Sequence, residues 1–101
     1  MKPHGKSDII KFLQENRDLI HSYGVKKIGL FGSFVRNTQN HKSDIDLLVE
    51  FDSERLRYEN YINLAYYIED NLNRKVDLVT VDSLSPYIGP HILKEVEYVS
   101  L

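Results

Sequence analysis

The segment 44–51 constrains the fold of this chain more than any other feature of its sequence. Every second residue in it is apolar, which is the period of a β-strand with one buried face. The apolar positions are Ile45, Leu47, Val49 and Phe51. The other face begins with two carboxylates, Asp44 and Asp46, and continues with Leu48 and Glu50. We therefore expect a strand that is buried on one face and begins acidic on the other.

Two elements are expected before this strand. Residues 7–22 repeat apolar side chains near a helical period, and Gly24 stands where a left-handed residue would end a helix. Residues 26–31 are rich in Ile, Leu and Phe and stop at Gly32, as in a strand that feeds a tight turn. A turn or a single helical turn is predicted over 33–37, followed by a polar loop.

Three elements are expected after it. A stripe of apolar and tyrosine side chains predicts the longest helix of the chain between 54 and 72. A strand is predicted over 76–81, where the pattern alternates again around Asp77. A final helix is expected after 85–86, because proline suits a first turn, although Pro90 favours regular helix only beyond it. The predicted buried face of this helix is Ile92, Leu93, Val96 and Val99.

This order of elements predicts an α/β (α+β) fold, in which a small mixed β-sheet is covered by helices on one face. The other face of the sheet would then be partly open, and the acidic side chains belong there. The chain has 101 residues, of which 42% are hydrophobic, and it contains no repeat, low-complexity tract or linker. We therefore expect one domain that spans residues 1–101.

Composition excludes several classes of protein. A net charge of -2 argues against the binding of bulk nucleic acid, because proteins that bind a phosphate backbone are usually strongly basic. The absence of cysteine excludes a disulfide framework and a thiolate metal site. No apolar run approaches the roughly 20 residues that span a bilayer, and no signal peptide is visible. We expect a cytoplasmic protein that does not enter a membrane.

Two carboxylates at positions i and i+2 of a strand point to the same face. Asp44 and Asp46 lie about 6.6 Å apart along such a strand and could grip one cation together. Two ionised carboxylates this close repel each other, and a bound divalent cation would offset this repulsion. Ligands that are all oxygen select hard cations, and Mg²⁺ is commonly held by carboxylates together with phosphate oxygens of a substrate. Asp77, on the open face of its own strand, could complete the group.

A phosphate-binding segment is predicted directly before the acidic strand. Gly32 ends a predicted strand and lets backbone approach a ligand closely, while the hydroxyl of Ser33 adds a hydrogen-bond donor. Arg36 would lie one helical turn further along, where its guanidinium could brace a triphosphate.

Each of these features has a simpler explanation when it is taken alone. An Asp-x-Asp pair is usually a solvated strand face, a Gly-Ser pair is usually a turn, and Arg36 alone would be a surface residue. A calcium loop is disfavoured, because Ile45 and 47–49 are apolar strand formers and the EF-hand spacing is absent. The combination of the features, in this order, is more specific than its parts.

The combination resembles the signature of the polymerase-beta-like nucleotidyltransferase superfamily, in which Gly-Ser is followed after a short spacer by Asp-x-Asp. The matching residues are Gly32-Ser33, Arg36 and Ser43-Asp44-Ile45-Asp46-Leu47-Leu48-Val49. The segments 75–80, 84–88 and 92–99 look like the MNT group, the minimal nucleotidyltransferases of bacteria and archaea.

The resemblance implies that Asp44 and Asp46 bind Mg²⁺. It implies that Asp77 is a third ligand or the base that accepts the proton of the acceptor. Gly32 and Ser33 would hold the triphosphate of the substrate ATP.

The chain departs from the family pattern after the arginine of the Gly-Ser segment. The family usually has glycine there, whereas Asn37 follows Arg36 in this chain. Asparagine tolerates left-handed backbone better than other residues with a side chain, so the turn could be kept.

In function, the resemblance implies transfer of AMP from ATP to an acceptor hydroxyl. Larger members of the superfamily carry extra helical regions that bind the acceptor, so something else must present the hydroxyl here. MNT proteins resemble antitoxins encoded beside a HEPN-domain ribonuclease toxin, and a tyrosine of that toxin is the leading acceptor. Two alternatives stay open: a non-catalytic module that neutralises the toxin by contact, and a stand-alone enzyme that adenylylates a small molecule such as an aminoglycoside.

Tyrosines are numerous enough to furnish an aromatic interface with a partner, although helix tyrosines at such spacings are also common in a core. The candidates are Tyr58, Tyr61, Tyr66, Tyr67, Tyr87 and Tyr98.

Overall fold

The computed structural model describes residues 2–52 and 58–101. Its elements, in chain order, are α1 (Lys6–Glu15), α2 (Arg17–Ser22), β1 (Val25–Phe31), α3 (Ser33–Arg36), β2 (Ile45–Phe51), α4 (Tyr58–Leu72), β3 (Val76–Thr80), the 3₁₀ helix η1 (Val81–Ser83), α5 (Gly89–Glu95) and β4 (Glu97–Tyr98). The predicted start of the long helix, at 54–57, lies outside the described residues.

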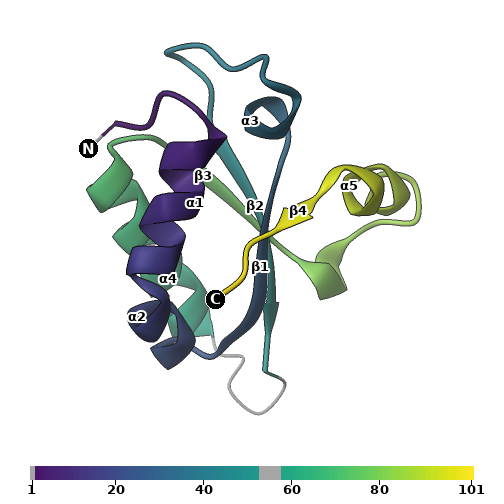
Figure 1. The fold of residues 1–101 in the computed structure, drawn as a ribbon. Helices are drawn as coiled ribbons and strands as arrows, with labels where there is room; N and C mark the ends of the chain where they lie inside the picture. Colours follow the sequence, from purple (N-terminus) through teal and green to yellow (C-terminus); the bar gives the residue numbers. More distant parts are fainter. Residues whose placement is uncertain (1, 53–57) are drawn as a thin grey trace.

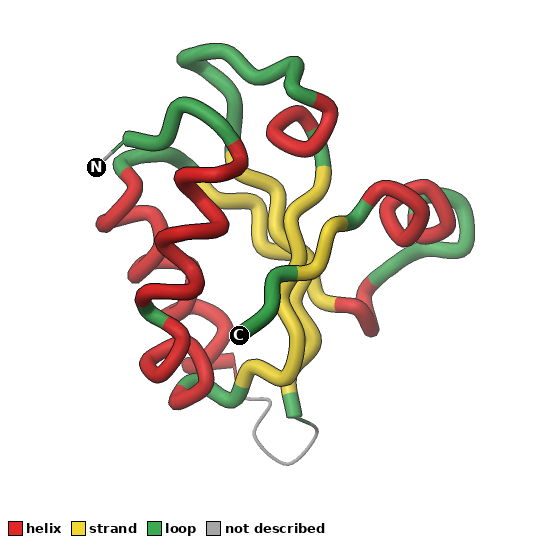
Figure 2. Tube along the Cα trace, viewed as in Figure 1, coloured by secondary structure: helices red, strands yellow, loops and turns green. Residues whose placement is uncertain are grey.

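The four strands form one mixed sheet in the order β3-β2-β1-β4. β2 and β3 run parallel, while β1 is antiparallel to both of its neighbours. Helices α1, α2 and α4 cover one face of the sheet, and α5 lies on the other side (Figures 1 and 2). The predicted fold class, a small mixed sheet with helices, is confirmed.

The core lies between the sheet and helices α1, α2 and α4. The apolar side of β2 points into it, and Ile45, Leu47 and Val49 are at most 1% exposed, as their alternation predicted. Leu48 points to the opposite face but is also buried, because η1 packs against β2 there. The second face of the sheet is therefore partly covered, whereas the acidic residues near the start of β2 are accessible. Within the described residues no helix is both long enough and apolar enough to cross a bilayer.

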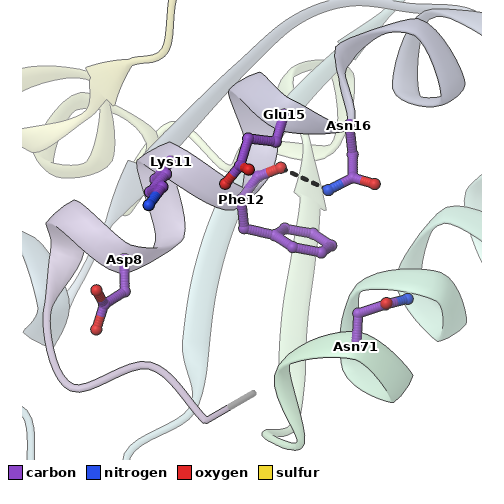
Figure 3. A pocket seen from close by; sticks show the side chains of 6 residues that line it. All are labelled: Asp8, Lys11, Phe12, Glu15, Asn16 and Asn71. Carbon is purple, nitrogen blue, oxygen red and sulfur yellow. Dashed lines mark hydrogen bonds between the residues drawn. The ribbon is translucent and has the colours of Figure 1, made fainter.

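The predicted N-terminal helix is divided into α1 and α2 at Asn16. The amide nitrogen of the Asn16 side chain donates to the carbonyl oxygen of Phe12 at 2.8 Å (Figure 3), and its backbone leaves the helical region at φ -109° and ψ 19°. Such a side-chain bond competes with the helical ladder. Gly24 adopts φ 90° after α2, which confirms the left-handed position that was predicted there.

The predicted C-terminal helix is wrong in both its extent and its buried face. α5 begins at Gly89, with Pro90 in its first turn, and ends at Glu95. Leu93 is 52% exposed, and Val96 and Val99 lie beyond the helix. The strand β4 follows instead, because the edge of β1 offers backbone hydrogen-bonding groups and the sequence after α5 alternates as a strand does.

Gly29 of β1 makes room for this C-terminal strand. A Cβ built at Gly29 would lie 2.5 Å from Cγ2 of Val96 and 3.2 Å from the carbonyl oxygen of Glu97. We expect Gly29→Ala to lower the free energy of unfolding by about 2 kcal/mol, since a methyl group there forces β4 away from β1. Faster hydrogen exchange of the Val99 amide, which donates to Ile28 at 2.9 Å, would check this result. An unchanged exchange rate at Val99 would contradict it.

Candidate active site

Asp46 and Asp77 are direct neighbours in the sheet. They are paired in the parallel register of β2 and β3, so their side chains leave the same face. That face is opposite to the core, because Ile45 and Leu47, on either side of Asp46, are buried under the helices. Asp44 lies just before β2, two residues from Asp46, and it is exposed, as is Asp77. The three predicted acids therefore share one region of the open face.

The electrostatics of Asp46 show how close these acids are. The pKa of Asp46 is raised from 3.8 to about 6, first by burial of the carboxyl group and then by the charges of Asp77 and Asp44. Arg36 lowers the pKa of Asp46, and Glu95 raises it. Ionisation of Asp46 is thus less favourable in the folded protein than in water, and a bound cation would offset this cost.

The three carboxylates do not converge on one point as they stand. In the described part of the chain no group of three or more His, Cys, Asp or Glu side chains is gathered closely enough to hold a metal ion. Asp44 and Asp77 would have to turn toward the half-buried Asp46 to share an ion with it. The donor atoms on this face are oxygens, which suit a hard divalent cation such as Mg²⁺.

Gly32 joins β1 to α3 and lies against Asp46 of the acidic strand β2. Its backbone has φ 78°, a region that residues with a side chain rarely adopt. A Cβ at Gly32 would lie 2.1 Å from Oδ2 of Asp46. Only glycine therefore satisfies both the backbone angle and the position of the Asp46 carboxylate.

The backbone amide of Gly32 and the side chain of Arg36 meet at one carboxylate, that of Glu95. The Gly32 N–H donates to Oε2 of Glu95 at 3.1 Å, and Nη1 of Arg36 lies 2.5 Å from Oε1 of Glu95. Glu95 is the last residue of α5 and reaches the site from the C-terminal part of the chain. Two groups predicted to hold phosphate oxygens thus already hold an anion.

The turn around Ser33 keeps the geometry expected of the Gly-Ser segment. Ser33 is half-buried and begins the single helical turn α3, and its carbonyl oxygen accepts from the N–H of Thr38 at 2.9 Å. Asn37 ends α3 in the left-handed region, with φ 60° and ψ 37°. The asparagine therefore adopts the backbone conformation for which glycine would be the usual residue.

A cavity of about 370 Å³ adjoins Asp77 on this face. Its walls come from β1, β3, η1 and the C-terminal region: Phe31, Asp77, Val79, Ser83, Leu84, Ser85, Ile88 and Ile92. Most of these side chains are apolar, and Asp77 is the acidic group among them. The cavity can accept a flat or apolar group close to the acids.

A second hollow lies on the opposite side of the sheet, between α1 and α4 (Figure 3). It is lined by Asp8, Lys11, Phe12, Glu15, Asn16 and Asn71. The predicted site residues are not among them, so this hollow is separate from the acidic face.

Residues 7–100 match the family model described as Polymerase beta, Nucleotidyltransferase. The chain belongs to this nucleotidyltransferase family. The chain is 41% identical over 83 residues to the protein adenylyltransferase MntA of Thermococcus cleftensis, which covers 82% of this chain and 83% of that relative.

Two solved structures are similar to this nucleotidyltransferase. A minimal nucleotidyltransferase superposes with a TM-score of 0.70 at 28% identity, over 87% of this chain and 93% of its own. A toxin–antitoxin structure with AMP-PNP gives a TM-score of 0.66 at 29% identity, over 91% of this chain and 69% of the other. Both support the mixed sheet and the helices described above.

Glu95 is the site residue that the sequence analysis of this nucleotidyltransferase missed. The predicted residues Asp44, Asp46 and Asp77 share one face, and Gly32 and Arg36 adjoin it. Glu95 is 63 residues from Gly32 along the chain. It lies in a segment that was predicted only as an amphipathic helix, in which a glutamate is ordinarily an exposed residue.

The raised pKa of Asp46 predicts a pH-dependent stability for the metal-free enzyme. The pKa of Asp46 is higher in the folded protein, about 6, than its ordinary value of 3.8, so its contribution to stability is fully present below pH 3.8 and is lost as the pH rises through about 6. In EDTA, Asp46→Asn is expected to raise the free energy of unfolding by about 2 kcal/mol near pH 7.5 and by much less near pH 4.5. Urea unfolding at the two pH values measures this. An equal gain at both would show that charge is not the cause.

Proposed function

We propose that this nucleotidyltransferase transfers AMP from ATP to a tyrosine hydroxyl of a HEPN-domain toxin, in a reaction that requires Mg²⁺. The observation that carries the proposal is the pairing of Asp46 with Asp77 on a face where Gly32 abuts the Asp46 carboxylate. This arrangement joins a group of acids to a segment that already holds an anion. The similarity to a protein adenylyltransferase and to a toxin–antitoxin structure with AMP-PNP supports the choice of ATP and of the partner.

Each residue has a defined role in this proposal. Asp44, Asp46 and Asp77 would hold Mg²⁺, which would neutralise the charge that develops on the phosphates. Gly32, Ser33 and Arg36 hold the triphosphate by hydrogen bonds and, for Arg36, by charge.

The chemical step is an in-line displacement at the α-phosphorus of ATP. The acceptor oxygen forms a bond to the α-phosphorus, the bond between the α-phosphorus and the bridging oxygen breaks, and pyrophosphate leaves. The proton of the hydroxyl goes to Asp77 if Asp77 acts as the base, and to solvent water if Asp77 is only a metal ligand. Most of the rate enhancement comes from positioning the two reactants and from electrostatic stabilisation.

The acceptor is proposed to enter beside Asp77. The cavity there is mostly apolar, and the neighbouring surface exposes Tyr87 at 85%, Ile88 at 61% and Leu93 at 52%. A protein partner would cover such side chains, whereas a small molecule would leave them in water. This exposed surface is the observation that favours a protein acceptor over the stand-alone enzyme for small molecules.

The tyrosines divide into two groups. Tyr58, Tyr66, Tyr87 and Tyr98 are exposed, while Tyr61 and Tyr67 are half-buried. The hydroxyl of Tyr61 donates to the Leu78 carbonyl oxygen and that of Tyr67 to Oδ1 of Asn16. We propose that Tyr87 contributes to the partner surface and that Tyr61 and Tyr67 are structural.

We also propose that the reaction takes place in the cytoplasm, which fits a chain without cysteine.

Co-expression with a HEPN toxin tests the proposed function. The intact mass of the toxin is expected to rise by whole AMP units, and peptide sequencing is expected to place them on tyrosine. A toxin whose tyrosine is replaced by Phe should stay unmodified, which is the matched control. A stable complex in which the toxin never gains mass would favour the non-catalytic antitoxin instead.

A further inference from the structure

We propose that Glu95 is a built-in competitor that occupies the triphosphate-binding position of the empty enzyme and must leave it before ATP can bind. This inference rests on the proposed function, because it takes Gly32 and Arg36 as the groups that hold the triphosphate. It adds a residue from the C-terminal part of the chain to the control of nucleotide binding.

The Glu95 carboxylate contacts the groups that are proposed to hold the triphosphate. Its two oxygens are used separately, one by the Gly32 N–H at 3.1 Å and one by Arg36 Nη1 at 2.5 Å. This is the way in which two oxygens of a phosphate group would engage the same donors. The Glu95 side chain is 21% exposed, so it lies within the site and not in open solvent.

The sheet holds Glu95 in this position. The residues that follow it form β4, and Leu30 and Gly29 of β1 pair with Glu97 and Tyr98. β1 is followed directly by Gly32. The strand that leads into the proposed phosphate-binding turn therefore also pairs with β4, the segment that follows α5. The position of Glu95 is therefore set by the sheet and not by a mobile terminus.

Charge makes Glu95 and a triphosphate exclude each other from this position. A carboxylate and a triphosphate cannot share the same two donors, and both are anionic, so each repels the other from the position. Binding of ATP must break the pair between Glu95 and Arg36 and turn the carboxylate away. Because the Arg36 side chain is 57% exposed, solvent screens this pair, and its effect on affinity should be moderate.

Glu95 could compete with phosphate or could hold Arg36 in place, and the two roles predict opposite effects of the same substitution. If Glu95 competes with phosphate, removing its charge tightens the binding of an anion. If Glu95 only holds Arg36 in a useful orientation, removing its charge weakens the binding. The sign of the change in affinity therefore distinguishes the two roles.

Calorimetry with sodium tripolyphosphate in EDTA, and separately with ATP and MgCl₂, tests the proposal on the full chain. We expect Glu95→Gln and Glu95→Ala to bind both ligands about three- to tenfold more tightly than the unmodified protein. Glu97→Gln is the matched control, since Glu97 lies two residues further on and pairs with Lys6 at 2.9 Å instead of with the site. Its affinities should not change.

The amide resonance of Gly32 provides a second readout that needs no ligand. It should move in the NMR spectrum of Glu95→Gln but not in that of Glu97→Gln. The dispersion of the same spectra shows whether the variants are folded. Binding by Glu95→Gln that is equal to or weaker than that of the unmodified protein would overturn the competitor role while leaving the proposed function in place. Failure of every variant to bind either ligand would overturn both.

Discussion

Asp46→Asn is expected to reduce the rate of AMP transfer from ATP by at least about a thousandfold while the protein stays folded. Asp46 is the central acid of the site, since it pairs with Asp77 in the sheet and feels the charges of both other acids. The asparagine side chain has nearly the shape of the aspartate side chain but lacks the negative charge that binds a cation. Labelled AMP transferred per minute to the toxin measures the loss, and the thermal midpoint of each protein reports its folding.

The matched control for this substitution is Asp70→Asn. Asp70 lies near the end of α4, is exposed and does not line the cavity beside Asp77. Its substitution should leave the transfer rate within about twofold, because surface changes away from a site have small effects. A folded Asp46→Asn protein that transfers AMP as fast as this control would remove Asp46 from the catalytic site.

Gly32→Ala is expected to destabilise the protein by about 3 kcal/mol and to abolish AMP transfer as well. A non-glycine residue at φ 78° costs about 1–2 kcal/mol, and the new methyl group would lie 2.1 Å from Oδ2 of Asp46. The strain can be relieved only if the turn or the Asp46 carboxylate moves, and either movement separates the acids from the phosphate-binding segment. Urea unfolding and the transfer assay measure the two effects.

Gly5→Ala is a suitable comparison for this substitution. Gly5 has φ -155°, which any residue can adopt, and a Cβ there would meet only Nε2 of Gln39 at 3.7 Å. Its cost should stay below about 1 kcal/mol. If Gly32→Ala were as stable and as active as Gly5→Ala, the close approach of Gly32 to Asp46 would have no functional meaning.

Local periodicity was sufficient to predict much of the sheet and its acidic face. The alternation in β2 placed Ile45, Leu47 and Val49 in the core and Asp46 on the other face, because a strand has a fixed side-chain period. The backbone preference of asparagine was similarly informative, since Asn37 does adopt the left-handed region. Such inferences depend on a few neighbouring residues and need no knowledge of the tertiary structure.

The errors arose where distant parts of the chain decide the structure. Val96 and Val99 fit the apolar stripe of a helix, but the edge of β1 pairs with this segment and Gly29 gives it room. The helix break at Asn16 depends on one side-chain hydrogen bond to Phe12, which competes with a periodic pattern that continues through it.

The site itself was predicted only in part for the same reason. The three acids lie in segments whose alternation places them on the open face, and Gly32 was recognisable as the glycine that ends a predicted strand. Glu95 carries no such signal, because its role depends on the return of the chain from α5 to β1. A glutamate near the end of a short amphipathic helix is otherwise an ordinary surface residue.

Two labelled forms of ATP, used in parallel reactions with the proposed HEPN toxin, follow the α-phosphate and the γ-phosphate separately. With MgCl₂ present, label at the α-phosphate of ATP is expected to appear on the toxin, label at the γ-phosphate is expected to leave with pyrophosphate, and EDTA is expected to stop both. Toxin that gains γ-label, or that gains no label in the presence of folded enzyme, ATP and MgCl₂, would contradict the assignment of this acidic face as a site of AMP transfer.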